Sequence, residues 1–328
     1  MLQPGNGSMR ILKTMLFVAG AVLLAVLVHR VGAEPILQTL ARLTWWQFAL
    51  ICLPYAAIMA VDTLGWRFAF ARDRAPFRRL YAARVVGEAL NIVTALGAVG
   101  GEAAKAWLVR DEVAYEESVP SVVIAKTTIT IAQALFLVLG IALAWAALDV
   151  SSDIVRGMFW LLVVEVAAVG GFFGAQLSGL VARGGRLLTR LRVLGDAGAA
   201  QQIDRALRTY YRREWRRFAL SVAFHLMGWL LGAVEAIVML WALGIDTSMV
   251  TATVVEALGS GVRFATFLVP ASLGVFEGAN AAAFGALGFG AGAGLAFSFV
   301  RRARQAVWVG VGLLFLLPEL RRRRRGAR

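Results

Sequence analysis

Two glutamates of this chain each precede a basic residue by the same distance. Lys126 follows Glu102 by 24 residues, and Arg301 follows Glu277 by 24 residues. A glycine-broken apolar stretch leads to each glutamate, and a long apolar run follows each basic residue. Ionisable side chains in apolar surroundings are costly and mark functional sites by default. The repeated spacing therefore predicts one structural unit used twice, with a broken helix at the same place in each copy.

The first broken stretch carries glycines beside charged side chains. Gly100 and Gly101 allow the backbone to leave a helix, and N–H groups exposed there can hold an anion. Glu102 and Lys105 flank the break, where they either pair with each other at a helix end or contact a ligand. The candidate site residues of this region are Glu88, Asn91, Gly100, Gly101, Glu102, Lys105 and Lys126.

Upstream of that break, Glu88 and Asn91 lie three residues apart, so a helix would place them on one face. Arg84, four residues before Glu88, offers a helical ion pair as the structural alternative. Asn91 is suited either to bind a headgroup or to cap a broken helix.

The second broken stretch combines Pro270 and Gly274 with three charged residues. Arg263 and Arg301 supply two positive charges, and Glu277 supplies one negative charge. A phosphate diester needs basic groups and amide donors, whereas an amine headgroup or a proton would use the carboxylates. Both stretches therefore suit a path for a lipid headgroup, and they leave the headgroup unidentified.

The composition indicates a membrane protein. The chain is 59% hydrophobic and 16% charged, with a mean hydropathy of +0.72, outside the range of soluble domains. Several runs reach the roughly 18–20 apolar residues that cross a bilayer core. We therefore expect an all-α polytopic integral membrane protein. Six full spans are predicted, at about 11–31, 46–70, 119–147, 156–181, 218–243 and 303–320.

Two further apolar regions, 85–117 and 249–299, are interrupted by charged residues and glycines. Arginine counts predict their orientation, with six arginines in 67–84, ten in 183–217 and six in 321–328. Cytoplasmic loops are rich in Lys and Arg. Placing all three arginine-rich segments inside makes 85–117 a re-entrant hairpin from the cytoplasm and 249–299 a re-entrant hairpin from the other side.

This arrangement gives two membrane halves of inverted topology, residues 1–150 and 151–328, with both termini cytoplasmic. One cluster counts against it, because Arg301, Arg302 and Arg304 would start a span on the outer side. The alternative is eight or nine ordinary helices, with the 24-residue spacing a coincidence.

The connector 183–217 and the tail 321–328 are the most basic segments. Leucines and tyrosines recur at helical spacing among the arginines of the connector. This pattern fits a basic amphipathic helix on the anionic cytoplasmic leaflet, or else a solvated linker. The tail is interpreted as a topology anchor that binds the membrane surface.

Four isolated ionisable residues in apolar segments are weaker candidates. Glu165 and Glu235 fall in the middle of spans, where they are suited to interhelical pairing or to proton coupling. Glu256 and His225 stand alone in the same way.

Other classes of site find little support. The single cysteine, Cys52, excludes an intrachain disulfide and a thiolate metal cluster. His29 and His225 lack metal-binding spacing, and no phosphate-loop, dinucleotide or serine-hydrolase motif appears. The net charge of +14 sits at helix ends, so it reflects membrane topology rather than nucleic-acid binding. We therefore expect no cofactor, no metal and no nucleic-acid partner.

Short motifs around the two breaks resemble the flippase-like transmembrane family that includes the membrane part of lysylphosphatidylglycerol synthases. The motifs are Arg84-x-x-Gly87-Glu88-x-x-Asn91, Gly100-Gly101-Glu102 and Val269-Pro270-x-x-x-Gly274-Val275-x-Glu277-Gly278. Within that family, the chain is most similar to the hopanoid-biosynthesis-associated membrane proteins. The resemblance covers nearly the whole chain and implies movement of a lipid between leaflets. It marks as path residues Glu88, Asn91, Gly100, Gly101, Glu102, Pro270, Gly274 and Glu277.

Two departures from the family pattern matter. Thr94-Ala95 stand where the first motif usually carries a proline, so the first hairpin is expected to be broken less sharply, or by Gly97 alone. The soluble aminoacyltransferase domain of the synthases is absent from the sequence, so headgroup aminoacylation is not expected.

From these observations we expect a lipid translocase of the bacterial inner membrane, not an enzyme. Its substrate would be a phospholipid or a polycyclic isoprenoid (hopanoid-type) lipid, and its partners would be membrane lipids, anionic or isoprenoid, and lipid-biosynthesis enzymes. An intramembrane lipid-modifying enzyme and a non-catalytic partner of a lipid-biosynthesis complex are the alternatives. The headgroup would pass Lys105, Lys126, Arg263 and Arg301, with Glu102 and Glu277 as counter-charges or proton carriers.

Overall fold

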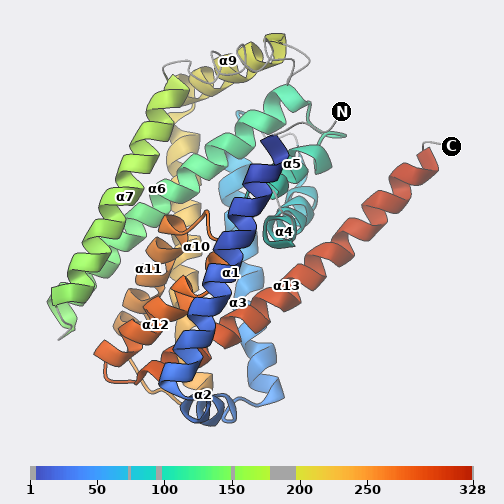
Figure 1. Ribbon diagram of the computed structural model, residues 1–328. Helices are drawn as coiled ribbons and strands as arrows, with labels where there is room; N and C mark the ends of the chain where they lie inside the picture. The colour runs from blue at the N-terminus through green and yellow to red at the C-terminus, as the bar shows by residue number, and fades with distance from the viewer. Residues whose placement is uncertain (1–4, 73–74, 94–97, 149–151, 178–196, 327–328) are drawn as a thin grey trace. The chain divides into compact units, whose positions relative to one another are not determined.

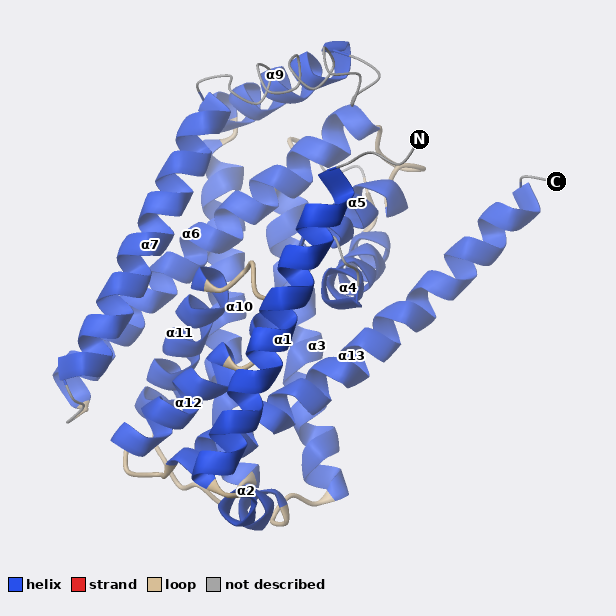
Figure 2. Ribbon diagram, viewed as in Figure 1, coloured by secondary structure: helices blue, strands red, loops and turns tan. Residues whose placement is uncertain are grey.

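The described part of the chain is built from helices joined by short loops. The structure is a computed structural model that describes residues 5–72, 75–93, 98–148, 152–177 and 197–326. Within these ranges the ribbon contains helices and loops and no strand (Figures 1 and 2). The expectation of an all-α protein is therefore confirmed.

Five of the helices are long and apolar enough to cross a membrane. They correspond to five of the six predicted spans, so the chain is a polytopic membrane protein. Apolar residues that carry good helix propensity fill these segments. Pro120 lies inside α6, at its sixth residue, where it removes one N–H from the helix hydrogen bonds. The five helices are α1 (Gly5–Val31), α3 (Trp45–Phe68), α6 (Tyr115–Ala147), α7 (Ser152–Leu177) and α10 (Trp215–Ala242).

The helices contribute to two compact units, and each unit combines separate stretches of the chain. The boundary between the units falls inside α3, α6, α7, α10 and the last helix, α13 (Ala291–Gly326). The predicted inverted halves, residues 1–150 and 151–328, describe a structural repeat, whereas the two units are defined by their compactness. The division into inverted halves therefore stays a prediction. Unit 1 comprises Met1–Tyr55, Phe136–Glu165 and Leu230–Gln305, and unit 2 comprises Ala56–Leu135, Val166–Trp229 and Ala306–Arg328.

Unit 2 contains a hairpin of two short helices, α4 (Phe77–Val93) and α5 (Ala98–Leu108), which pack against each other (Figure 1). The hairpin begins eight residues before the predicted start at 85, because apolar side chains such as Leu80, buried in the core of the unit, already belong to α4. The predicted break at Gly97 lies outside the described residues.

Unit 1 contains the second helical hairpin, α11 (Met249–Ala265) and α12 (Val275–Ala286), joined through a 3-10 turn η1 (Pro270–Ser272). The side chain of Ser248 caps α11 by accepting a hydrogen bond from the Thr251 N–H. Each hairpin helix is shorter than the roughly 20 residues that typically cross a bilayer. That the two hairpins enter from opposite sides stays a prediction.

The last helix corrects two predicted boundaries. Helix α13 begins at Ala291, so residues 291–299 belong to it and not to the second hairpin, and the helix that contains the predicted span 303–320 begins before residue 303. The cause is that three arginines at positions 301, 302 and 304 interrupt the apolar pattern without interrupting the helix. Helix α13 is not among the five helices that are long and apolar enough to cross a membrane.

Two short elements complete the fold. Helix α2 (Ala33–Leu40) was not expected; it follows α1 after Gly32, whose φ of 86° turns the chain at low cost. Helix α9 (Ala197–Arg213) confirms that part of the connector 183–217 is helical. Leu207 and Tyr210 of α9 are buried in the core of unit 2, so its apolar face covers the protein itself.

Candidate functional site

The α4–α5 hairpin of unit 2 is held by an asparagine and a glycine. The N–H of Gly101 donates a hydrogen bond to Oδ1 of Asn91 at 2.9 Å. A Cβ atom at Gly101 would lie 2.0 Å from the carbonyl oxygen of Gly87, so only glycine permits this approach of α5 to α4. The interpretation of Asn91 as a cap is consistent with this contact, and its Nδ2 also reaches Glu88 at 3.4 Å.

The charged residues of this hairpin pair with each other. Nζ of Lys105 donates to both carboxylate oxygens of Glu102, at 3.0 and 3.1 Å. Lys126 of α6 and Arg84 of α4 also act electrostatically on the Glu102 carboxylate. Glu102, Lys105 and Lys126 therefore belong to one local charge group in unit 2.

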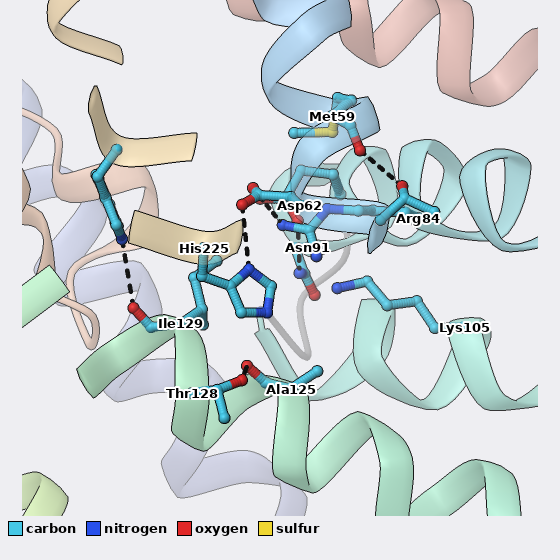
Figure 3. A network of polar contacts seen from close by, with 12 residues as sticks. Met59, Asp62, Arg84, Asn91, Lys105, Ala125, Thr128, Ile129 and His225 are labelled. Atoms are coloured by element: carbon cyan, nitrogen blue, oxygen red, sulfur yellow. Dashed lines mark hydrogen bonds and ion pairs between the residues drawn. The ribbon is translucent and has the colours of Figure 1, made fainter. Parts of the chain in front are cut away.

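One buried polar group of unit 2 was not predicted from the sequence. Asp62 of α3 accepts a hydrogen bond from Arg84 at 2.7 Å and lies 3.1 Å from Nδ1 of His225 on α10 (Figure 3). All three side chains are less than one-tenth exposed. Arg84 thus contacts Asp62 on another helix, whereas the sequence offered Glu88 as its partner.

Reciprocal glycines make room for this group where α3 meets α10. A Cβ at Gly65 would lie 2.6 Å from the ring of His225, and a Cβ at Gly228 would lie 2.5 Å from Oδ1 of Asp62. Each helix therefore carries a polar residue and, three positions later, the glycine that accepts the polar residue of the other helix. This Asp-x-x-Gly and His-x-x-Gly spacing in apolar segments was the signal that could have identified the group.

In unit 1, the carboxylate of Glu277 accepts hydrogen bonds at the turn between the two hairpin helices. Its Oε2 accepts a hydrogen bond from the N–H of Gly274 at 2.7 Å, and its Oε1 accepts one from Nε of Arg302. Arg302 also donates to the carbonyl oxygen of Ala271 at 3.2 Å. The cation that binds Glu277 is therefore Arg302, and the 24-residue spacing to Arg301 does not describe this ion pair.

The same turn has an unusual backbone. Pro270 opens the 3-10 turn, and Gly274, with a φ of 77°, ends it at the start of α12. Ala271 and Ser272 have φ values of 54° and 50°, a region that side chains other than glycine seldom occupy. Such strain persists only where the surroundings hold it, and the Arg302 contact with Ala271 is one such restraint.

A buried charge cluster lies beside that hairpin. Glu256 of α11 pairs with Arg263, at 2.9 Å, and with Arg301. Glu235 of α10 accepts a hydrogen bond from Arg304 at 2.8 Å, and Arg301 lies 3.9 Å from it. Three arginines thus face two glutamates, and the Nε atoms of Arg301 and Arg304 have no hydrogen-bond acceptor among the described residues.

Ion pairs within unit 1 account for the arginines that conflicted with the predicted topology. Arg301, Arg302 and Arg304 lie inside α13, and each pairs with a glutamate of a different helix: α11, α12 and α10 respectively. The positive-inside rule concerns charges in loops. Because these three charges are paired within the protein, they carry no information about sidedness.

The predicted site residues therefore fall into two groups. Glu88, Asn91, Gly100, Gly101, Glu102, Lys105 and Lys126 belong to unit 2, and Arg263, Pro270, Gly274, Glu277 and Arg301 belong to unit 1. Within the described ranges no cluster of three or more His, Cys, Asp or Glu side chains could hold a metal ion.

Comparison with known protein families gives a match over most of the chain. The family described as "Lysylphosphatidylglycerol synthase TM region" matches residues 11–313 of the chain. No curated protein and no solved structure matches the chain.

Proposed function

Because the chain belongs to the family of the lysylphosphatidylglycerol synthase transmembrane region, a family of membrane proteins linked to lipid handling, we propose that it moves a lipid between the two leaflets of a membrane. The lipid is a phospholipid or a polycyclic isoprenoid of the hopanoid type. The protein acts as a translocase and not as an enzyme.

One observation carries this proposal: each unit holds a hairpin of short helices whose second helix bears a glutamate bound to a cation. In unit 2 the pair is Glu102 with Lys105, and in unit 1 it is Glu277 with Arg302. Charged groups inside a membrane protein line the routes of polar substrates. Broken helices at corresponding positions are typical of transporter binding sites.

The charge of unit 1 favours an anionic group on the lipid. The cluster of Glu235, Glu256, Arg263, Arg301 and Arg304 has one more positive than negative charge. Some of its N–H donors have no acceptor within the part of the chain that the structure describes. Arg263 is one-third exposed, so it is the member that a headgroup would meet first. A phosphate diester would neutralise the excess charge and accept hydrogen bonds from the guanidinium groups.

The remaining residues of the path follow from the hairpins. We assign Glu88, Asn91, Lys105 and Lys126 to contacts with the headgroup in unit 2. Pro270 and Gly274 would permit the irregular backbone that such a path needs. Gly100 and Gly101 instead lie in the first turn of α5, where Gly101 lets that helix approach α4 closely. The headgroup would pass by rocking of one repeat against the other.

The setting proposed for this activity is the bacterial inner membrane, with both termini in the cytoplasm. The partners are the membrane lipids themselves, with lipid-biosynthesis enzymes as suppliers of the substrate.

The test is leaflet exchange by the purified full chain in phosphatidylcholine vesicles. The phospholipid probe is nitrobenzoxadiazole-labelled phosphatidylglycerol, whose outer-leaflet fraction is bleached by dithionite. The isoprenoid probe is a polycyclic triterpenol, extracted from the outer leaflet by cyclodextrin. We expect exchange of at least one probe, slowed about tenfold in Glu102→Gln and Glu277→Gln because each loses a charge-assisted contact.

The matched control is Glu116→Gln, since Glu116 is an exposed glutamate in the first turn of α6. This variant should exchange lipid at the rate of the unchanged protein. Vesicles that show no faster exchange than protein-free vesicles, for either probe, would contradict the proposal. Recovery of a chemically altered probe would favour the intramembrane enzyme instead.

A further inference from the structure

Asp62 divides its two carboxylate oxygens between two basic side chains. Oδ2 accepts a hydrogen bond from Nη2 of Arg84 at 2.7 Å, and Oδ1 lies 3.1 Å from Nδ1 of His225 (Figure 3). The His225 side chain is fully enclosed. The carboxylate therefore has one permanent cation, Arg84, and one partner that is charged only when it holds a second proton.

The geometry defines the protonation state of His225 in this arrangement. A carboxylate can only accept hydrogen bonds, so Nδ1 of His225 carries the hydrogen that points to Asp62. Nε2 is buried and has no hydrogen-bond partner among the described residues. A hydrogen on Nδ1 alone satisfies the contact with Asp62, so a neutral ring fits this arrangement and leaves the lone pair of Nε2 available for a proton.

The charged groups around His225 come from three helices. Asp62 of α3, Arg84 of α4 and Lys105 of α5 all act on it. Helix α6 contributes the uncharged Thr128, which contacts Ser221 one turn before His225 on α10. While Arg84 neutralises Asp62, the two cations oppose a further positive charge on the ring.

Withdrawal of Arg84 would reverse this balance. Asp62 would then be a buried carboxylate without its cation, a state that is strongly unfavourable unless another positive charge replaces it. His225 is already in contact with the carboxylate, so a proton on its ring supplies that charge without any movement of α3 or α10. The glycines at positions 65 and 228 keep the two side chains together.

We propose that Asp62 and His225 form a proton-exchange site in which a proton on His225 takes the place of the Arg84 guanidinium. When Arg84 leaves, Nε2 takes a proton from hydronium: the new N–H bond forms, the O–H bond breaks and water remains. When Arg84 returns, the proton is released to water. Arg84 lies on the first helix of the α4–α5 hairpin, so displacement of that helix is linked to binding of one proton.

This link would allow a proton gradient to drive lipid movement, and in that respect it rests on the proposed function. The exchange site itself does not depend on transport. It can therefore be tested in the absence of any lipid substrate.

The test is the titration of His225 by nitrogen-15 NMR of the full chain in lipid nanodiscs. The chain has two histidines, so a His29→Gln background leaves His225 as the single signal. We expect a neutral ring at pH 7 in this background. Arg84→Gln should move the midpoint of proton uptake to higher pH by about one to three pH units, and adding Asp62→Asn should abolish that shift.

Arg110→Gln is the matched control, since Arg110 is an exposed arginine at the end of the same hairpin. It should leave the midpoint unchanged. Equal midpoints in Arg84→Gln and its parent would overturn the proposal, and so would a charged ring at pH 7 in the parent. If Arg84→Gln does not fold, Arg84→Lys replaces it in the same titration. The lysine side chain is shorter and pairs less closely with Asp62, so the midpoint of His225 protonation should move to higher pH by a smaller amount.

A second measurement separates this proposal from the proposed function. Exchange of labelled phosphatidylglycerol and of the triterpenol probe is compared with and without a pH difference across the vesicle membrane. Acceleration by the gradient, lost in His225→Gln, is the expected result. No exchange of either probe under any gradient would reject the proposed function, while the NMR titration would still decide the proton site.

Discussion

Arg304 of α13 donates a hydrogen bond to Oε2 of Glu235 on α10 at 2.8 Å, and both side chains are less than one-tenth exposed. Arg304 also stacks over the ring of Tyr55, 4.1 Å from its centroid. A buried ion pair contributes little net stability when it is compared with apolar residues of similar size. Removing one partner is different, because the other charge is then left buried and unpaired.

We therefore predict that Arg304→Gln lowers the free energy of unfolding by about 3–5 kcal/mol. Replacing both partners, as in Glu235→Leu with Arg304→Met, should cost less than the single change. Arg156→Gln removes an exposed pair with Asp153 and should change stability by no more than about 0.5 kcal/mol. Thermal unfolding in detergent measures the stability of the three variants. Equal losses of stability in Arg304→Gln and Arg156→Gln would contradict the prediction.

The reciprocal glycines of α3 and α10 give a second prediction. Gly228→Ala places a methyl group 2.5 Å from Oδ1 of Asp62, so either the buried carboxylate or the two helices must shift. We expect a loss of about 1–3 kcal/mol, seen as a lower unfolding midpoint. Gly157→Ala is the matched control, because no atom lies within 4 Å of a Cβ at that helical position. It should stabilise the protein by up to about 1 kcal/mol.

The turn of the second hairpin gives a third prediction. Glu277→Ala removes the acceptor for both the Gly274 N–H and Arg302. Ser272, which is 7% exposed, should then become accessible. With Cys52 replaced by alanine, a cysteine at position 272 should react with a thiol reagent about tenfold faster in the Glu277→Ala background, consistent with loss of about 1.5–3 kcal/mol of charge-assisted hydrogen bonding. An unchanged rate in that background would mean that Glu277 does not restrain the turn.

The long helices could be predicted from the sequence because hydropathy and length decide them. Five predicted spans have their counterparts in α1, α3, α6, α7 and α10. The beginning of α13 could not be found in the same way. Its arginines look like a loop when the chain is read alone, and they are compatible with a helix only because carboxylates of other helices neutralise them.

Only those contacts of the site that join residues close in sequence could be predicted. The Glu102–Lys105 pair joins residues three positions apart, so helical spacing revealed it. The contacts of Asp62 with Arg84 and His225 join residues that are 22 and 163 positions apart. No periodicity connects them, although an aspartate inside an apolar span is itself a sign of function.

The equal 24-residue spacing predicts a repeated unit and does not by itself identify ion pairs. The distance from Glu277 to Arg301 repeats that from Glu102 to Lys126, but Arg302 is the residue whose side chain reaches Glu277. Adjacent helical residues point about 100° apart, so one position decides which helix a side chain faces.

The central claim of this account is that the hairpins α4–α5 and α11–α12 enter the membrane from opposite sides. Single cysteines at positions 115, 246, 286 and 326, in a Cys52→Ala background, can be probed in intact cells with a membrane-impermeant thiol reagent. The account predicts that Tyr115→Cys and Gly326→Cys react only after the membrane is opened, whereas Asp246→Cys and Ala286→Cys react from outside. Reaction of Tyr115→Cys from outside, or protection of Ala286→Cys, would contradict the two opposed hairpins.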